Sequence, residues 1–198
     1  MKDFLQVIKV INQMQAAGVI GKYAIGGAIG ASFYPVEPTV TFDIDVFIPF
    51  KNISGGSIVS LEHVYNYLKP LGYKPKDEHV IIEGWLVQFL PADDELHNEA
   101  LLQAVERNVG GVKTQITYPG LPTHTVETDV DGVKTWVMTA EHLMAIALKT
   151  GRGKDLTRIE QFVTNKAFDA NKLNQILARN GLLAKWEQLN YKCIEGNK

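Results

Sequence analysis

A pair of aspartates lies inside an apolar stretch of the sequence. In TFDIDVFIP (residues 41–49), Asp43 and Asp45 alternate with apolar residues, and the stretch is rich in β-branched and aromatic side chains and closes at Pro49. Such a pattern is typical of a β-strand. Side chains at positions i and i+2 of a strand point to the same face, with Cα atoms roughly 6.5–7 Å apart. The two carboxylates therefore share one face, where they repel each other unless a cation lies between them.

Two carboxylates at this spacing suit a hard divalent cation. Mg²⁺ takes oxygen ligands and commonly uses one or two carboxylates together with substrate phosphates. Two such metals lie roughly 3.5–4 Å apart in phosphoryl-transfer sites, which the D-x-D geometry can span. Asp43 and Asp45 are therefore candidate ligands for Mg²⁺ or Mn²⁺. The plainer interpretation of an isolated D-x-D pair is a solvated strand edge.

A glycine pair precedes the aspartates and adds to this interpretation. Gly26 and Gly27 follow a short apolar stretch, residues 22–25, and open a short helical segment. Glycine lets a phosphate approach the backbone, and the free N–H groups at a helix N-terminus attract anions. Alone, such a pair is a common tight turn. Followed by the D-x-D strand, it predicts a unit that holds a triphosphate at one end and its metal at the other.

These motifs resemble a known family. GGAIGASFY (26–34) followed by TVTFDIDVFIP (39–49) resembles the signature of the polymerase β-like nucleotidyltransferase superfamily. The nearer resemblance is to the minimal and AbiEii-type nucleotidyltransferases, whose members include toxins of toxin–antitoxin systems. GWLVQFLPADDELHNEAL (84–101) is similar to the strand and helix that follow in that group. TAEHLMAIALKTGRGKDLTRIEQF (139–162) is similar to its late helical motif, with an R-x-K-D segment, so that the resemblance covers roughly residues 20–165.

The resemblance implies a Mg²⁺-dependent enzyme that moves a nucleoside monophosphate from a nucleoside triphosphate (NTP) to an acceptor. The acceptor is not identified by the sequence and could be tRNA, a protein or a small molecule, and an antitoxin protein is an expected partner. The site residues that the resemblance implies are Asp43, Asp45 and Lys149 for catalysis, the two aspartates as metal ligands, and Gly26, Gly27, Thr41, Lys149 and Arg152 for nucleotide binding. Further candidates are Gln88, Lys154 and Asp155.

The basic residues of the late helical motif suit phosphate binding. Lys149 ends the apolar run LMAIALK (143–149), and because a charged residue is unexpected there, we favour a functional role for it. A lysine offers a point charge to phosphate, and Arg152 can offer a bidentate contact. The alternative for Arg152, Lys154 and Asp155 is a surface ion-pair cluster worth under about 1 kcal/mol. For Lys154 we favour that alternative.

Two positions depart from the family pattern. Many superfamily enzymes carry a third carboxylate on a later central strand, and the matching position here is Gln88, which is neither a general base nor a good Mg²⁺ ligand. Three alternatives stay open. The acceptor is activated differently, another acid such as Glu83 substitutes, or the chain is a weak or inactive descendant that binds nucleotides or a partner. A purely structural, antitoxin-like role is a weaker alternative. The second departure is Thr39, where relatives often have an arginine.

The surrounding pattern predicts the elements that position these residues. We expect an α/β (α+β) fold with a mixed sheet flanked by helices, comprising an α/β core over residues 1–137 and a helical part over residues 138–198 packed on it. Helices are predicted over 2–17, 57–72, 92–106, 139–150, 154–164 and 168–181, and strands over 22–26, 41–49, 80–83 and 85–90. Further extended segments are expected over 110–120 and 124–138, with an Asp131–Gly132 turn.

Composition sets the remaining limits. The 198 residues have a net charge of −2, which does not demand a nucleic acid or an anionic membrane. Residues 1–133 hold 9 Lys/Arg against 16 Asp/Glu, and residues 134–198 hold 11 against 6. An acidic part facing a basic part could hold a metal and a phosphate together, but from charge alone we favour random asymmetry. The single cysteine, Cys193, excludes a disulfide within the chain. No long apolar segment is present, so we expect a cytoplasmic protein without a membrane partner.

Overall fold

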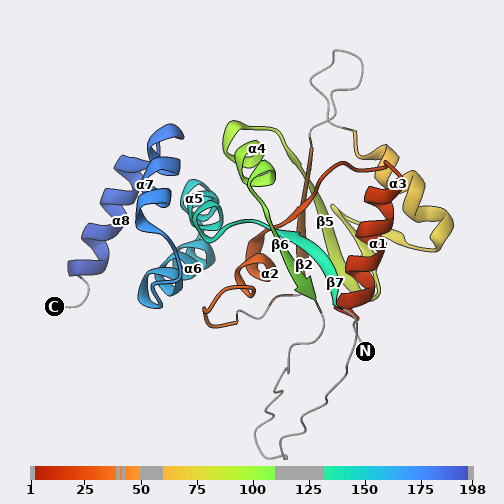
Figure 1. The fold of residues 1–198 in the computed structure, drawn as a ribbon, viewed down its shortest axis with the longest axis horizontal. Helices are drawn as coiled ribbons and strands as arrows, with labels where there is room; N and C mark the ends of the chain where they lie inside the picture. The colour runs from red at the N-terminus through yellow and green to blue at the C-terminus, as the bar shows by residue number, and fades with distance from the viewer. Residues whose placement is uncertain (1–2, 39–40, 42, 50–59, 110–131, 196–198) are drawn as a thin grey trace, which may run out of the picture.

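The computed structural model describes residues 3–38, 41, 43–49, 60–109 and 132–195, and the side chains up to residue 189. It contains a mixed seven-stranded sheet with helices on both faces, and a group of helices beside the sheet that leads to the C-terminus (Figure 1). This confirms the predicted α/β class and the C-terminal helical part. The division into 1–137 and 138–198 stays a prediction.

The order of the strands in the sheet is β3-β4-β5-β2-β1-β7-β6. The strands are β1 (Ala24–Ile25), β2 (Asp43–Pro49), β3 (Lys74–Lys76), β4 (His79–Ile82), β5 (Trp85–Ala92), β6 (Val105–Val109) and β7 (Val133–Val137). The helices are α1 (Phe4–Ala16), α2 (Gly27–Ala31), α3 (Glu62–Leu68), the 3₁₀ turn η1 (Lys69–Leu71), α4 (Glu95–Leu102), α5 (Ala140–Thr150), α6 (Gly153–Thr164), α7 (Ala170–Arg179) and α8 (Leu183–Glu195). Strand β2 pairs with β5 in parallel and with β1 antiparallel.

The two faces of β2 have different neighbours. Ile44, Val46 and Ile48 are at most 2% exposed and belong to the apolar cluster that α1 and α3 complete. Asp43 and Asp45 alternate with them and so lie on the opposite face of the strand. Figure 1 shows α4 and the helical group on the side of the sheet away from α1 and α3. The strand thus buries one complete apolar face, which leaves its other face free to carry charge.

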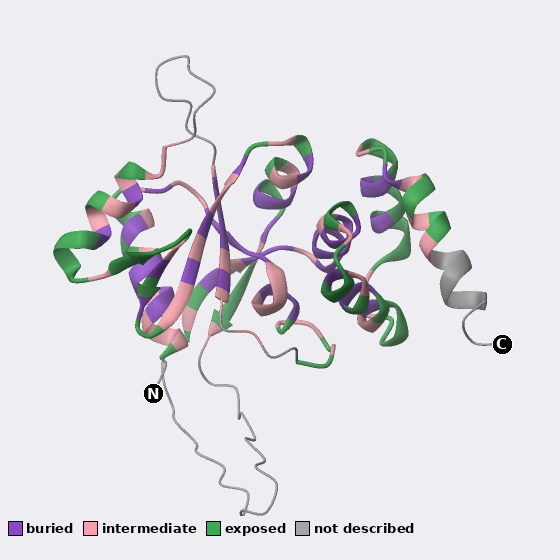
Figure 2. Cartoon of the chain, turned by 180° about the vertical axis from the view of Figure 1, so that it is seen from behind, coloured by how far each residue is buried: buried purple, intermediate pink, exposed green. Residues whose placement is uncertain are grey.

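The helical group is organised around α5. Thr139 caps its start by accepting a hydrogen bond from the His142 backbone N–H, and Gly151 ends it in the left-handed conformation. Eight of its eleven residues are buried (Figure 2). One apolar cluster joins Phe47 of the sheet to Leu143 of α5 and to residues of α6 and α7. Helix α5 is therefore the layer between the sheet and the outer helices.

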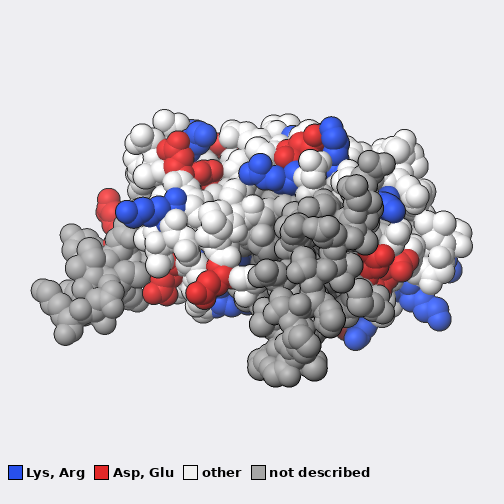
Figure 3. Space-filling model, turned by 60° about the horizontal axis from the view of Figure 1, so that its bottom comes forward, with Lys and Arg blue, Asp and Glu red and all other residues white. Residues whose placement is uncertain are grey.

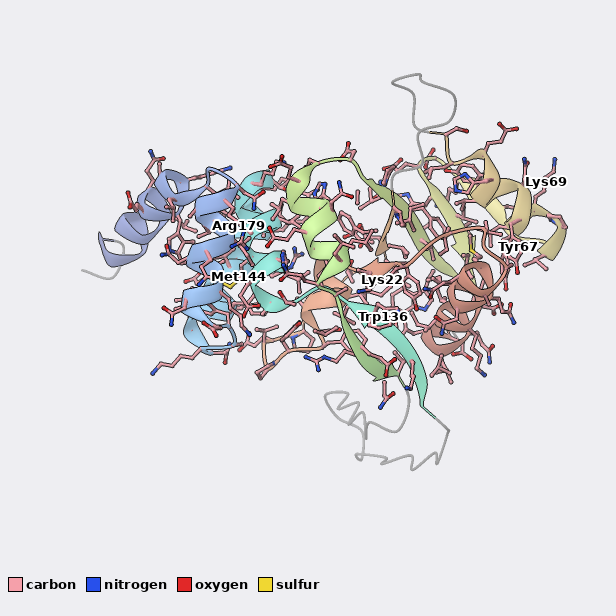
Figure 4. All side chains as sticks on the ribbon, turned by 45° about the horizontal axis from the view of Figure 1, so that its top comes forward. Lys22, Tyr67, Lys69, Trp136, Met144 and Arg179 are labelled. Carbon is pink, nitrogen blue, oxygen red and sulfur yellow. The ribbon has the colours of Figure 1, made fainter. Side chains whose placement is uncertain are left out.

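Contacts of Lys22 connect the start of β1 to the β6 edge of the sheet. The Lys22 ammonium, just before β1, donates hydrogen bonds to the carbonyl oxygens of Leu102 (2.8 Å) and Ala104 (3.3 Å). It also lies 4.6 Å from the centroid of the Trp136 ring (Figure 4). These contacts tie the end of α4 and the start of β6 to the sheet.

Two strands differ from the expectation. The helix predicted over 92–106 ends at Leu102, and β6 begins at Val105, although Glu106, Arg107 and Asn108 are exposed and show no apolar alternation. The exposed strand β3 was not predicted. Of the extended segments, only β7 lies within the described residues, and residues 110–131, including Asp131 of the predicted turn, lie outside them, as does Thr39. Among the described helices, none is long and apolar enough to span a membrane.

Candidate functional site

A cavity of about 490 Å³ lies between the charged face of the sheet and the helical group. Its lining comes from the start of α2, the β2 and β5 strands, the β5–α4 turn and helices α5 and α6. The lining residues are Gly27, Ala28, Thr41, Asp43, Asp45, Phe47, Gln88, Leu90, Pro91, Asp93, His97, Met138, Leu143, Ile146, Ala147, Thr150, Arg152, Lys154, Asp155 and Arg158. The cavity thus brings together most of the residues that the sequence singles out.

The sheet wall carries the two aspartates. The Thr41 hydroxyl donates a hydrogen bond to the Asp43 carboxylate. Among the described residues, no Lys, Arg or His nitrogen lies within 4.0 Å of an oxygen of Asp43 or Asp45. Burial raises the pKa of Asp45, and the charge of Asp43 raises it further. The two carboxylates therefore form a half-buried negative pair with no cation of the described chain in direct contact.

The glycine pair packs directly against this wall. Gly27 has φ +58°, and a Cβ at this position would lie 1.9 Å from the Asp45 Oδ2 atom. A Cβ on Gly26 would lie 2.6 Å from Cε2 of Phe47. The Gly26 N–H donates to the Asp45 backbone carbonyl over 2.9 Å. Glycine is therefore required at both positions, because the backbone of the α2 start touches the side chains of the D-x-D strand.

The helical wall presents the opposite charge. Asp155 is 1% exposed and accepts hydrogen bonds from Arg152 Nε (2.7 Å) and Arg158 Nη1 (3.3 Å). Arg158 is 9% exposed, and its Nε atom is buried without a hydrogen-bond partner among the described residues. The buried aspartate therefore orients two guanidinium groups at the cavity, one of which keeps an unused donor.

The charges on each wall shift the pKa values of groups on the other wall. The Asp155 hydrogen bond raises the pKa of Arg152, and the charges of Asp155, Asp45 and Asp43 add to this. In the other direction, Arg158, Lys154 and Arg152 offset part of the upward pKa shift of Asp45. Acidic side chains of β2 and basic side chains of α6 and the turn before it thus line the same cavity. On the face shown in Figure 3, acidic and basic side chains outside the grey residues are interspersed.

Sequence reasoning missed Arg158. The residue lies three positions after Asp155 on α6, so one turn of helix brings both side chains to the same face. The sequence DLTR (155–158) shows this spacing, and the spacing was the available signal. That Arg158 is buried could not be deduced from the spacing, because it depends on α5 lying over α6.

The structure places Gln88 beside the aspartates. Gln88 is the Cα partner of Asp45 in the parallel β2–β5 register and lines the same cavity. Glu83, the suggested replacement for a third carboxylate, is in the wrong place for that role. It lies in the β4–β5 turn at φ +50°, accepts a hydrogen bond from the Tyr73 hydroxyl (3.0 Å) and does not line the cavity.

Lys149 does not lie with the residues expected to be its neighbours. Its ammonium forms an ion pair with the Asp94 carboxylate at 2.6 Å, its side chain is 47% exposed, and it does not line the cavity. The reason is the phase of the helix. Ile146, Ala147 and Thr150 of α5 line the cavity, whereas Lys149, one position before Thr150, projects from another side of the helix. Arg152, Lys154 and Arg158 supply the positive charge instead.

Asp94 forms the centre of a second acidic group. Asp93, Asp94 and His97 have ligand atoms within 4.8 Å of one another. The Asp94 Oδ1 atom already accepts the His97 backbone N–H (2.8 Å), and Oδ2 contacts Lys149. Burial alone would raise the pKa of Asp94, but the hydrogen bonds from Lys149 and from His97 outweigh it and the pKa is lowered. The described cations therefore satisfy this carboxylate, unlike those of Asp43 and Asp45.

Comparison with known proteins finds a similarity among solved structures only. No protein-family model matches the chain. No curated protein matches it either. Among solved structures, the chain is similar to an antigenic nucleotidyltransferase-like protein from Paracoccidioides brasiliensis, with 14% identity, a TM-score of 0.48 and coverage of 94% of this chain and 89% of that chain. At this TM-score the similarity assigns neither a family nor an activity to the chain.

Proposed function

We propose that the chain is a Mg²⁺-dependent nucleotidyltransferase that moves a nucleoside monophosphate from an NTP to an acceptor hydroxyl or phosphate. The observation that carries this proposal is the pair of carboxylates, Asp43 and Asp45, facing a basic helical wall across one cavity. A metal–triphosphate has this charge pattern, a cation next to a polyanion. Catalysis would consist mostly of electrostatic stabilisation and in-line positioning.

The chemistry of the donors fits a hard cation. Asp43 and Asp45 offer oxygen ligands, the upward pKa shift of Asp45 reflects like charge and burial, and no described cation neutralises the pair. Mg²⁺ or Mn²⁺ would be held by these two carboxylates and would supply charge neutralisation at the phosphates. Gly27 gives the backbone of α2 its close approach to Asp45.

The remaining residues have roles toward the nucleotide. We assign phosphate binding to Arg152 and Arg158, because both guanidinium groups are oriented by Asp155 and line the cavity. Gly26 and Gly27 shape the backbone that faces the phosphates, and Thr41 orients Asp43 through its hydroxyl. Lys154 is exposed at the cavity and adds positive charge there.

The finer assignment rests on the sequence resemblance alone. It assigns the chain to the AbiEii-type, toxin-like nucleotidyltransferases, acting in the cytoplasm with an antitoxin protein as partner. The acceptor would then be tRNA, a protein or a small molecule. The part of the resemblance that lies at the cavity is the R-x-K-D segment, residues 152–155, through Arg152 and Asp155.

A second candidate function is nucleotide or partner binding without turnover. Gln88 favours it, because the position directly opposite Asp45 in the sheet carries a neutral amide. A binding module keeps the charge pattern of the cavity but forms no product.

Incubation with α-³²P-labelled ATP, CTP, GTP and UTP in the presence of Mg²⁺ or Mn²⁺ tests the proposal, with total tRNA, the protein itself and glycerol as acceptors. We expect label transfer by the wild type and at least a roughly thousandfold loss in Asp45→Asn. Asp77→Asn is the matched control, since Asp77 lies in the exposed β3–β4 turn at φ +51°, which asparagine tolerates. Nucleotide binding without transfer would favour the binding module, and absence of both would exclude both functions.

A further inference from the structure

The proposed reaction needs a group that removes the proton of the acceptor hydroxyl. Asp43 and Asp45 are assigned to the metal, and the amide of Gln88 is not basic at any ordinary pH. The cavity lining contains one imidazole within the described residues, that of His97 from the first turn of α4. Imidazole is the side chain most often used for proton transfer near neutral pH.

His97 is held next to the metal-binding face of β2. Its ring lies 5.2 Å, centroid to centroid, from the ring of Phe47. Phe47 follows Asp45 by two positions, so both side chains lie on one face of the strand, roughly 6.5–7 Å apart at Cα. The imidazole therefore packs on Phe47, the residue that follows Asp45 on the same face of β2.

The ring orientation of His97 is set by two carboxylates. Nδ1 lies 3.1 Å from Asp94 Oδ2 and 3.4 Å from Asp93 Oδ1. The Asp93 carboxylate accepts the hydrogen bond from Nδ1, so in the neutral ring Nδ1 carries the proton and Nε2 carries the lone pair. Nε2 has no hydrogen-bond partner among the described residues, and it is not buried. Asp94 is itself fixed, because it caps α4 and pairs with Lys149.

We propose, resting on the proposed function, that His97 is the general base for the acceptor hydroxyl and that Asp94 is its positioning residue. Nε2 takes the proton of the hydroxyl while the acceptor oxygen forms its bond to the α-phosphorus. The bond from that phosphorus to the β-phosphate oxygen breaks, pyrophosphate leaves, and the imidazolium later releases the proton to solvent. The products are the nucleotidylated acceptor, pyrophosphate and one proton.

The charges around His97 come from several elements. Asp93 and Asp94 lie on its own turn, and Lys149 reaches Asp94 from α5. The charged groups that share the cavity with His97 are Asp43 and Asp45 from β2 and Arg152, Lys154, Asp155 and Arg158 from the start of α6. The apparent pKa of the reaction therefore belongs to this set of groups, and the variants below identify the contribution of the imidazole.

The test compares His97→Asn with the wild type in the labelled-NTP assay, using the NTP and the acceptor that give the highest wild-type incorporation. The asparagine amide nitrogen can replace Nδ1 as donor to Asp93, but the variant has no base. We expect kcat to fall at least about 100-fold with little change in KM for the NTP. The wild-type rate should rise with pH to a plateau, and His97→Asn should lose this rise.

His79→Asn serves as the control, and Asp94→Asn tests the positioning role. His79→Asn changes a half-buried histidine of β4 that does not line the cavity, and it should keep the wild-type rate and pH profile. Asp94→Asn keeps the helix cap, since asparagine caps well, but removes the charge next to the imidazole. We expect the pH dependence of its rate to differ from that of the wild type, which loss of folding alone would not produce.

Three results would overturn the proposal. The first is a wild-type rate and pH profile in His97→Asn, which would leave the proposed function intact. The second is recovery of His97→Asn by raised Mg²⁺ or Mn²⁺, which would make His97 a metal ligand rather than a base. The third is no transfer by the wild type itself, in which case the proposed function fails together with this role for His97.

Discussion

The two walls of the cavity place carboxylates in opposite ways. On the helical wall, Asp155 is 1% exposed and contacts two guanidinium groups. On the sheet wall, Asp45 is half-buried next to a second carboxylate, and no described cation touches it. A charge that is buried with partners contributes to a rigid structure, whereas one that is buried beside a like charge is destabilising until something binds. The comparison predicts that one wall is built for stability and the other for a ligand.

The largest effect on stability is expected at Asp155. Asp155→Ala would leave Arg158 buried without its partner, and removing one member of a buried pair costs about 3–5 kcal/mol. Since Arg158 borders the cavity and water can reach it, we expect the lower end, about 3 kcal/mol in the free energy of unfolding, measured by urea denaturation. Glu160→Ala, an exposed acid on the same helix, should change it by less than about 0.5 kcal/mol.

A double variant sharpens this prediction. Asp155→Ala combined with Arg158→Met removes both charges and keeps most of the volume, so it should recover much of the loss. If the single and double variants are equally unstable, the ion pair is not the cause, and the helical wall is not stabilised by paired charge.

The next largest effect is expected at Gly27, which combines a positive φ with close contact to the Asp45 side chain. Gly27→Ala should lose about 2 kcal/mol or more, because alanine at φ +58° is strained by about 1–2 kcal/mol and its Cβ would meet the Asp45 carboxylate. Gly18→Ala is the control, with φ +69° and open space around the Cβ, and it should show the strain alone. The measurement is the urea midpoint at constant slope.

The source of the extra loss can be isolated. In an Asp45→Ala background the carboxylate is absent and only the 3.3 Å contact with the Cβ of residue 45 remains, so the cost of Gly27→Ala should fall toward that of Gly18→Ala. Equal costs in both backgrounds would mean that Gly27 does not depend on Asp45, contrary to the close packing of α2 on the D-x-D strand.

A smaller effect, of opposite sign, is expected at Asp45. Without metal, Asp45→Asn removes one of two repelling charges, so the variant should melt no lower than wild type in EDTA. Mg²⁺ with NTP should raise the melting temperature of the wild type, because a ligand that binds only the folded state stabilises it, and should leave the variant unchanged. A loss of several degrees in EDTA would make Asp45 a structural hydrogen-bonding residue.

The same residue predicts a pH dependence. The pKa of Asp45 is raised by folding above its ordinary value of 3.8, so the folded state binds the proton more tightly than the unfolded state does. Its contribution to the free energy of unfolding is therefore fully present below that value and is lost as the pH rises through the folded-state pKa. Urea denaturation across this range in EDTA should show that decline in the wild type and a weaker one in Asp45→Asn.

The smallest effect is expected at Lys149. Its pair with Asp94 is about half exposed at the lysine, so Lys149→Met should change the free energy of unfolding by less than about 1 kcal/mol. We expect the transfer rate to change by less than about threefold. A fall of 100-fold would instead support the sequence prediction that Lys149 contacts the phosphates, and would mean that the pair with Asp94 opens when nucleotide binds.

The sequence predicted the sheet wall correctly because its signals are local. Period-2 alternation alone places Asp43 and Asp45 on one face, and a strand followed by two glycines and a helix needs no long-range information. Helix α5 was equally readable, with Thr139 as its cap and Gly151 as its stop. Strand β6 was not, because its exposed residues 106–108 have no alternation and only pairing with β7 makes them a strand.

The sequence by itself therefore determined which residue types can do chemistry and which of them share a strand face or a helix turn. Only the tertiary structure decided which of these groups meet. Lys149 and Arg158 are both cations of the same helical motif, yet packing of α5 and α6 turns Arg158 into the cavity and Lys149 toward Asp94. It likewise brings Asp155 and His97 to the aspartates, since a contact between distant segments depends on how their elements pack, which no local period encodes.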